Sequence, residues 1–348
     1  MIDFFKSKKV LITGSTGFKG SWLSYLLSSY GANVYGYALK PLPVSNFNIL
    51  NIEKQIEQVY GDIRDKEKLK KFFDKIKPEI VFHLAAQAIV RESYVNPVHT
   101  FETNIIGSTN ILDCVLHSNT VRSLVYITSD KCYENKEWIW GYRENDELGG
   151  KDPYSSSKAC AELVFNSYLQ SFPFSNENKG IASARAGNVI GGGDFSADRL
   201  VPDCIRAVEN KKSMIIRNPN STRPWQHVLE PISGYMMLSK NLFDNVGFSG
   251  SWNFGPISSE VGSVEKLANG ILKHFDSNEI EFDNSNNNQY ESNLLQLNCD
   301  KANSLLDWHP KWDLNQTINH TAMWYKHYLD KNDMSKITSN QIDEYFGS

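Results

Sequence analysis

The chain has 348 residues, of which 41% are hydrophobic and 22% charged, and a formal net charge of −4; this is ordinary for a globular protein with a sizeable core. There is no basic excess that would favour nucleic acid or a membrane surface, no apolar run of about 20 residues that could span a bilayer, and no signal-peptide pattern in the N-terminal "MIDFFKSKKV". The five cysteines are widely spaced without a C-x-x-C pair, and the eight histidines form no metal-ligand pattern, so we expect reduced thiols, a cytoplasmic location and no metal.

Apolar runs typical of buried strands alternate with helical patterns over the first half of the chain. The expected strands span 8–14, 33–40, 59–65, 79–87 and 121–130, and the expected helices span 18–32, 66–78 and 100–119. This alternation is the signature of an α/β fold with a Rossmann-type, doubly wound parallel sheet.

The loop between the first strand and the first helix, "TGSTGFKG", contains three regularly spaced glycines. Gly14, Gly17 and Gly20 form a G-x-x-G-x-x-G pattern, which lets backbone N–H groups approach a pyrophosphate at the positive end of a helix. A tight strand-to-helix turn without a ligand is the alternative, although three glycines exceed what a turn needs. The loop therefore predicts a dinucleotide cofactor.

The adenosine end of this cofactor site lacks its usual acid. A carboxylate normally ends the second strand and holds the ribose 2′-hydroxyl, but here Ala38 stands near that position and Lys40 follows. We expect the cofactor to be NAD, bound weakly, and the sequence does not exclude NADP. Asp62 follows the third strand and could accept a hydrogen bond from the adenine amine; an acid stabilised by a helix N-terminus is an equally good interpretation.

Tyr154 and Lys158, in "DPYSSSKACAE", lie four residues apart and so share one face of a helix. A phenol with a pKa of about 10 is a poor base at neutral pH. A nearby ammonium should lower that pKa, and the lysine can also hold a nicotinamide ribose. A surface tyrosine stacked on a lysine stem is the alternative. Beside the glycine loop, the pair predicts redox chemistry, with the Ser129 hydroxyl as its third member.

The fifth strand ends in "TSDKCY", which places Asp130 next to Lys131 at the edge where such sheets hold their chemistry. An acid and a base beside a redox tyrosine are what an elimination adds to an oxidation. The base must be partly neutral, which burial and a cationic nicotinamide would favour. A surface ion pair in a turn is the alternative.

The second half has a different character. We expect a glycine-rich loop or turn at 187–195, a helix at 199–210, a strand–turn–strand at 213–228, a helix at 230–243, a strand at 251–256, and two or three helices around the polar segment 283–292. The expected division is an NAD-binding domain of residues 1–188, to which 226–258 return, and a smaller mixed α/β substrate-binding domain of 189–225 and 259–348.

The chain resembles the extended short-chain dehydrogenase/reductases, within them the nucleotide-sugar 4,6-dehydratases, and among these the branch that acts on CDP-glucose. The blocks that carry the resemblance are "TGSTGFKGSWLS", "HLAAQAIVRESY", "TSDKCYENKEWIWGYREND", "DPYSSSKACAEL", "ARAGNVIGGGD" and "RNPNSTRPWQHVLEP". They cover nearly the whole chain to about residue 260.

The resemblance implies a hydro-lyase of deoxysugar and lipopolysaccharide O-antigen synthesis, active as a homodimer or homotetramer. It assigns Tyr154 to oxidation at C4, Asp130 as the acid toward C6 and Lys131 as the base toward C5. The implied cofactor contacts are Gly14, Gly17, Phe18, Gly20, Asp62, Ile63, Leu84, Ala85, Ala86, Tyr154 and Lys158.

The substrate is then a nucleotide sugar, whose pyrophosphate suits arginine forks. The implied substrate contacts are Gln87, Asn188, Arg199, Arg217, Arg223 and His227. Two other functions stay open: a dehydratase or epimerase acting on another nucleotide sugar, and a non-catalytic protein that binds one.

Overall fold

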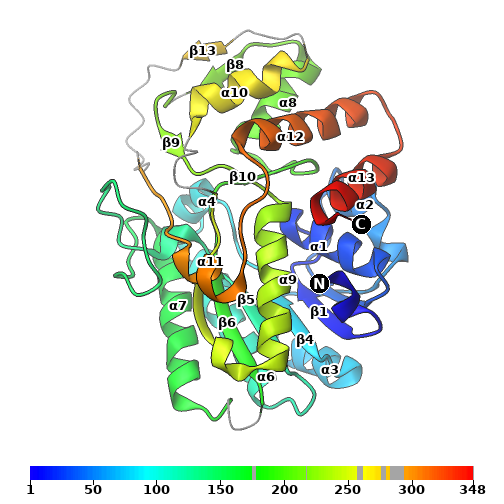
Figure 1. Ribbon diagram of the computed structural model, residues 1–348, viewed down its shortest axis with the longest axis vertical. Helices are drawn as coiled ribbons and strands as arrows, with labels where there is room; N and C mark the ends of the chain where they lie inside the picture. Colours follow the sequence, from blue (N-terminus) through cyan, green and yellow to red (C-terminus); the bar gives the residue numbers. More distant parts are fainter. Residues whose placement is uncertain (175–177, 217, 257–261, 276–279, 283–293, 348) are drawn as a thin grey trace.

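The computed structural model describes residues 1–174, 178–216, 218–256, 262–275, 280–282 and 294–347. Its centre is a parallel seven-stranded sheet in the order β11-β6-β5-β4-β1-β2-β3 (Figure 1). The strands are β1 (Lys9–Thr13), β2 (Asn33–Ala38), β3 (Glu57–Tyr60), β4 (Ile80–His83), β5 (Ser123–Ile127), β6 (Gly180–Arg185) and β11 (Gly250–Asn253). The predicted doubly wound sheet is confirmed.

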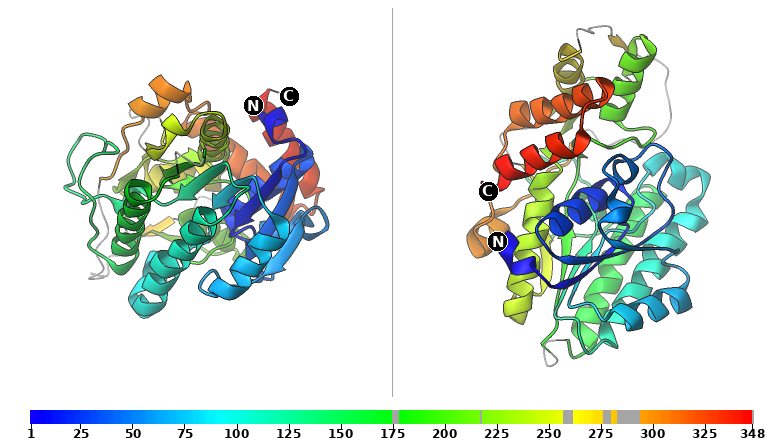
Figure 2. Two further views of the ribbon diagram at one scale, coloured as in Figure 1. Left: turned by 90° about the horizontal axis from the view of Figure 1, so that it is seen from below. Right: turned by 90° about the vertical axis from the view of Figure 1, so that its right-hand side faces the viewer.

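Helices cover both faces of the sheet, which is why its central strands are continuous apolar runs. Val10 and Ile12 of β1 pack on one face with α1 (Phe18–Ser29) and α9 (Leu229–Asp244). Leu11 points the other way, toward the face covered by α3 (Lys66–Ile76), α6 (Ser108–Leu116) and α7 (Pro153–Ser171). The two layers are visible end-on in Figure 2.

The helix expected at 100–119 is interrupted. It is built from α5 (Pro97–Phe101), a π-helical stretch η3 (Glu102–Gly107) and α6. Within the π-helix the buried Asn104 donates to the Gln87 carbonyl and the Ser157 hydroxyl, at 3.0 and 2.8 Å. Such insertions often occur beside functional sites, and this one faces the loop that follows β4.

A smaller unit lies beyond the carboxyl edge of the sheet, at the top of Figure 1. It contains α8 (Leu200–Asn210), α10 (Val264–Lys273), α12 (Leu314–Leu329) and the pair β8 (Met214–Ile216) and β13 (Ile280–Phe282). Two further short pairs are β7 (Val189–Ile190) with β10 (Gln226–His227) and β9 (Thr222–Arg223) with β12 (Gly262–Ser263). The remaining helices are α2 (Asn46–Ile49), α4 (Val90–Val95), α11 (Asp300–Leu306), α13 (Met334–Phe346) and the short turns η1 (Ile2–Phe5), η2 (Ile52–Lys54), η4 (Asp130–Cys132) and η5 (Val246–Phe248).

Two expectations for the second half need correction. The described tail, from residue 262 onward, contains four helices (α10 to α13) instead of two or three. Within the expected loop 187–195, the short strand β7 forms because β10 supplies a partner far along the chain. The polar segment 283–292 lies outside the described residues.

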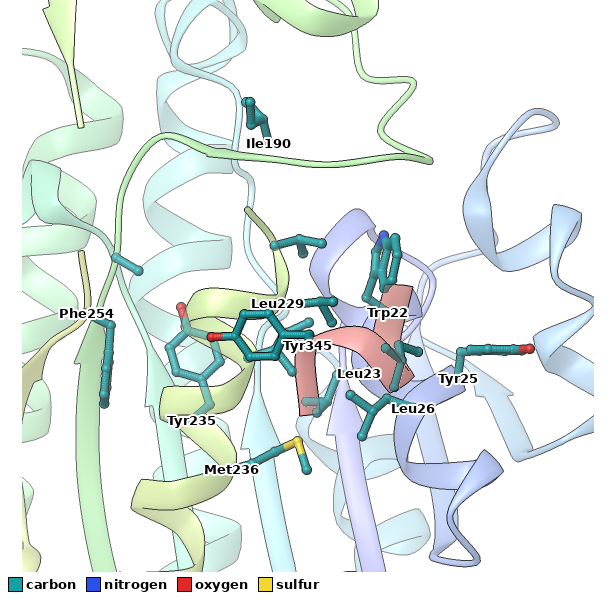
Figure 3. Close-up of a cluster of buried hydrophobic side chains, with 14 of the residues drawn as sticks. Trp22, Leu23, Tyr25, Leu26, Ile190, Leu229, Tyr235, Met236, Phe254 and Tyr345 are labelled. Carbon is teal, nitrogen blue, oxygen red and sulfur yellow. The ribbon is translucent and has the colours of Figure 1, made fainter. Parts of the chain in front are cut away.

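The C-terminal helix joins the two halves by packing beside α1. Figure 3 shows Tyr345 of α13 among Trp22 and Leu23 of α1 and Leu229 of α9. The Tyr345 hydroxyl donates to the buried Glu230 carboxylate at 2.5 Å. In the part of the chain that the structure describes, no helix has the length and apolar character needed to cross a membrane.

Candidate active site

A cavity of about 1150 Å³ runs along the carboxyl edge of the sheet, between the sheet and the smaller unit. This is where open α/β folds bind their ligands. Eighteen of the predicted site residues line it: Gly14, Gly17, Phe18, Gly20, Asp62, Ile63, Leu84, Ala85, Ala86, Gln87, Ser129, Asp130, Lys131, Tyr154, Lys158, Asn188, Arg199 and Arg223. Arg217 lies outside the described residues.

The glycine loop has the shape of a cradle for a pyrophosphate. Gly14 adopts φ +72°, and a Cβ there would lie 2.7 Å from the Ala85 backbone nitrogen. A Cβ on Gly20 would overlap the Gly14 carbonyl, so the helix can approach the loop only without one. Gly17 is the N-cap of α1 and offers no side-chain cap, which leaves N–H groups of the first turn to a ligand. These features fit a dinucleotide.

The part of the cavity predicted for the adenosine contains Asp62 and the end of β2. The Arg64 guanidinium bonds to the Asp62 carboxylate at 2.8 Å and lowers the pKa of that carboxyl. The N-cap of α3 is Asp65, so Asp62 is not the capping acid of that helix. At the end of β2, Ala38 and the exposed Leu39 line the cavity.

The acid–base pair lies in the short helix η4, directly after β5. Asp130 is only 1% exposed, so it does not form a surface ion pair. Ser129 donates its hydroxyl to one Asp130 oxygen at 2.9 Å, and the Asn188 amide donates to the other at 3.4 Å. The Lys131 Nζ lies 6.0 Å from the centre of the Tyr154 ring. The three side chains predicted to carry out oxidation and elimination therefore line the same part of the cavity.

Burial governs the protonation of Tyr154 and Lys158. It raises the pKa of Tyr154 to about 12, although a hydrogen bond with Ser129 and the charge of Arg199 lower it. Burial also lowers the pKa of Lys158 to about 8, and the Glu162 carboxylate opposes that change. The sequence predicted a lowered pKa for Tyr154; the structure gives the opposite direction, because desolvation outweighs the hydrogen bond with Ser129 and the charge of Arg199.

Two predicted substrate contacts are differently placed. His227 is fully buried, with its ring 5.9 Å from Trp22 and 4.7 Å from Trp312, and it does not line the cavity. We therefore remove His227 from the site. Gln87 lines the cavity, but its side chain donates to Thr100 at 2.8 Å and accepts from the Ile89 amide at 2.5 Å. Its side chain thus shapes the loop that follows β4.

The structure adds Lys19, which the sequence reasoning missed. Lys19 lines the cavity from the first turn of α1, and burial together with the charges of Lys158 and Arg199 lowers its pKa to about 7. The only signal was a charged residue directly before Gly20 in a loop otherwise made of small residues and Phe18. Within the described residues there is no cluster of His, Cys, Asp and Glu that could hold a metal.

The position of Asp130 depends on a glycine that follows β6. A Cβ at position 187 would overlap the Asp130 carboxylate. We expect Gly187→Ala to displace Asp130 and to slow any reaction that uses this carboxyl group by about 100-fold, the scale associated with a misplaced catalytic group. Gly255→Ala is the matched control, because a Cβ there meets its nearest atoms at 3.5 Å. Equal product formation by both variants would contradict the assigned packing; titration with NAD+ checks that the fold and the cofactor site persist.

Comparisons with known proteins identify the family of the chain. Residues 11–321 match the family described as GDP-mannose 4,6 dehydratase. CDP-glucose 4,6-dehydratase of Salmonella typhimurium is 45% identical over 100% of this chain and 99% of its own length. CDP-paratose 2-epimerase of Salmonella typhi is 26% identical over 91% of this chain and 98% of that protein.

Solved structures share the fold. The epimerase Mth375 of Methanothermobacter thermautotrophicus superposes with a TM-score of 0.80 at 25% identity, covering 94% of this chain and 95% of that one. The dTDP-glucose 4,6-dehydratase of Bacillus anthracis, solved in complex with NAD, gives a TM-score of 0.76 at 20% identity, covering 94% of this chain and 99% of that chain.

Proposed function

The chain belongs to the GDP-mannose 4,6-dehydratase family, and from this premise we propose that it is an NAD-dependent CDP-glucose 4,6-dehydratase. It converts CDP-D-glucose to CDP-4-keto-6-deoxy-D-glucose and water. The observation that carries the substrate assignment is the 45% identity, over the whole chain, to the Salmonella typhimurium enzyme of that name. The buried Asp130 and the half-buried Lys131 beside Tyr154 support the reaction type.

The side chains at the end of the cavity divide the reaction among them. Tyr154 takes the proton of the C4 hydroxyl, which Ser129 holds by a hydrogen bond, and the sugar becomes a 4-ketone. The ketone acidifies the C5 proton, which Lys131 removes, while Asp130 protonates the C6 hydroxyl so that it leaves as water. NAD, when bound, supplies the hydride acceptor for C4 and the donor for C6. Proton return to C5 completes a cycle without net oxidation.

The residues present suit NAD. The glycine loop and the open N-terminus of α1 would hold its pyrophosphate, and Lys158 would hold the nicotinamide ribose. Ala38 and Leu39 leave the ribose 2′-hydroxyl without a carboxylate partner from the end of β2. We therefore propose reversible cofactor binding.

The nucleotide-bearing end of the substrate lies toward the smaller unit. Asn188, Arg199 and Arg223 line the cavity there, and Arg199 also bonds to Asp194 at 3.4 Å. An arginine that is half-buried and already directed by a carboxylate is suited to a diphosphate. These positions are proposed as the contacts of the CDP group.

Four substrates distinguish the candidate functions. The protein is incubated with NAD+ and CDP-, UDP-, GDP- or dTDP-glucose, and the alkaline absorbance of a 4-keto-6-deoxy sugar is measured. Product from CDP-glucose alone is expected. Product from another nucleotide would reassign the base specificity, a C4 epimer without a keto product would indicate an epimerase, and binding without conversion would indicate a non-catalytic protein.

We also propose a homodimer, formed through η3 and α7. Ile106 and Leu163 are 56% and 58% exposed on these two neighbouring helices, so a second copy would remove apolar surface from water. A homotetramer would pair two such dimers. The mass of the protein in solution tests this, and Leu163→Glu should yield monomers; a wild-type monomer would refute it.

The cellular setting is the cytoplasm, where the five free cysteines would stay reduced. The product would supply deoxysugar synthesis for lipopolysaccharide O-antigen. Cell fractionation tests the first statement, and loss of the deoxysugar from the lipopolysaccharide of a deletion strain tests the second.

A further inference from the structure

An ion pair lies in the centre of the sheet domain, beneath the catalytic end of the cavity. The Arg185 Nη2 of β6 is 2.6 Å from the Glu162 Oε2 of α7, and the two side chains are 1% and 0% exposed. A buried ion pair is weak evidence for stability, because desolvation of both charges offsets their attraction. Its partners therefore suggest what else it does.

The same ion pair holds both ends of the segment that carries the acid and the base. Thr128, immediately before this segment, donates its hydroxyl to Glu162 Oε1 at 2.5 Å. Tyr133, immediately after it, accepts from Arg185 Nη1 at 2.7 Å, and the guanidinium lies 4.9 Å from the centre of the tyrosine ring. Residues 129–132 are thus flanked on each side by a residue that is hydrogen-bonded to the same ion pair.

Further contacts fix the ion pair to the sheet. Ser183 of β6 donates to Glu162 Oε2 at 2.9 Å, and Arg185 donates to the Ser251 hydroxyl of β11 at 3.0 Å. Tyr133 in turn donates to the Asn253 side chain at 2.8 Å. Each end of segment 129–132 is therefore anchored, through the ion pair and Tyr133, to strands of the central sheet.

Glu162 also belongs to the helix that carries the redox pair. It follows Lys158 by four residues and Tyr154 by eight, so the three side chains lie along one face of α7. A movement of α7 would be transmitted to the acid–base segment through this carboxylate.

We propose that the Glu162–Arg185 ion pair is a positioning device, which fixes the acid–base segment 129–132 against the helix that carries the redox pair. Its consequence is that a sugar oxidised at C4 meets the acid and the base without leaving the site. The proposal rests on the proposed function, because it assumes oxidation and elimination in one cavity.

The test is Glu162→Gln, which preserves shape and removes the charge. We expect its dehydration rate to fall by about 100-fold, because misplacement of a catalytic group by about 1 Å has that effect. We further expect NADH and the unfinished 4-keto sugar to accumulate during single turnovers, since oxidation continues after the acid and the base are displaced. A change of stability alone would not alter the ratio of accumulated NADH and 4-keto sugar to finished product.

The pH profile gives a second readout. Lys158 is surrounded by Glu162, the neutral Cys132 thiol, Lys19 of α1 and the buried His83 of β4, which stays neutral because burial lowers its pKa to about 3. Glu162 is the group that favours the charged lysine. Its neutralisation should therefore let Lys158 lose its proton at lower pH, and the alkaline limb of the oxidation rate should shift to lower pH.

Tyr133→Phe and Tyr168→Phe separate positioning from folding. Tyr133→Phe removes the hydrogen bond from Arg185 to the end of the segment and keeps the ion pair, so it should raise the ratio of accumulated NADH to finished product without shifting the alkaline limb of the oxidation rate. Tyr168→Phe is the matched control, because this tyrosine lies on α7, half-buried and outside the cavity, so it should match the wild type in both readouts.

The proposal is overturned if folded Glu162→Gln keeps both the wild-type ratio of accumulated NADH to product and the wild-type alkaline limb of the oxidation rate. If that variant does not fold, a wild-type ratio of accumulated NADH to product in Tyr133→Phe overturns the proposal instead. Failure of the proposed function looks different: the wild-type protein itself would then make no 4-keto-6-deoxy product from CDP-glucose.

Discussion

Replacing Asp130 by Asn and Lys131 by Ala together is expected to leave an enzyme that still oxidises the sugar with NAD+ but no longer eliminates water. Positioned acid–base groups each contribute about 10²- to 10⁴-fold, so loss of both should lower 4-keto-6-deoxy product formation by at least about 10⁴-fold. Oxidation at C4 uses Tyr154 and should persist at a slow rate. Mixing this variant with CDP-glucose and NAD+ should therefore yield NADH that is not consumed.

A matched control addresses the loss of a surface charge. Lys136 lies in the loop after the acid–base segment, where it is exposed and pairs with Glu147 at 3.0 Å. Lys136→Ala should keep both the transient NADH signal and the product. Full product formation by the double variant would refute the roles of Asp130 and Lys131. Failure of that variant to reduce NAD+ at all would mean that the pair also serves the first step.

The proposed reacting groups could be identified from the sequence because their signals are local. The glycine loop, the strand end with Asp130 and the tyrosine–lysine spacing each fall within one strand-to-helix junction or one helix. A parallel sheet brings the carboxyl ends of its strands to one edge, so the topology converts these separate motifs into one site. The cavity contains all of them.

The residues that we propose hold these groups in place were not predictable in the same way. Glu162 and Arg185 look like ordinary charges in sequence, and only the pairing of β6 beside β5 brings them together beneath the site. His227 lies in a polar segment of the sequence and was predicted to contact the substrate, but Trp312 and His320, from later in the chain, pack against its ring. Burial, which also sets the pKa of Tyr154, is a property of the assembled fold and has no local pattern.

Tyr154→Phe is expected to abolish the first step. The variant keeps the ring beside Lys131 and removes only the hydroxyl that takes the C4 proton, so NADH formation should fall by about 10³-fold. The affinity for CDP-glucose should change little, because the diphosphate contacts lie elsewhere. Tyr168→Phe is the control, since this tyrosine lies on the same helix, half-buried and outside the cavity.

The pH dependence of this step follows from the two shifted groups. In the proposed mechanism the phenolate is the active base, and burial holds the pKa of Tyr154 at about 12, so the wild-type oxidation rate should rise with pH from neutrality. Above about pH 8, Lys158 loses the charge that holds the cofactor ribose and supports the phenolate, so the rate should then fall. The Phe variant should lack the rising limb, because no phenol remains to titrate. A rising limb of unchanged size in that variant, measured as NADH formed in single turnovers, would assign the base to another residue, and the half-buried Lys19 beside Lys158 would be the first to examine.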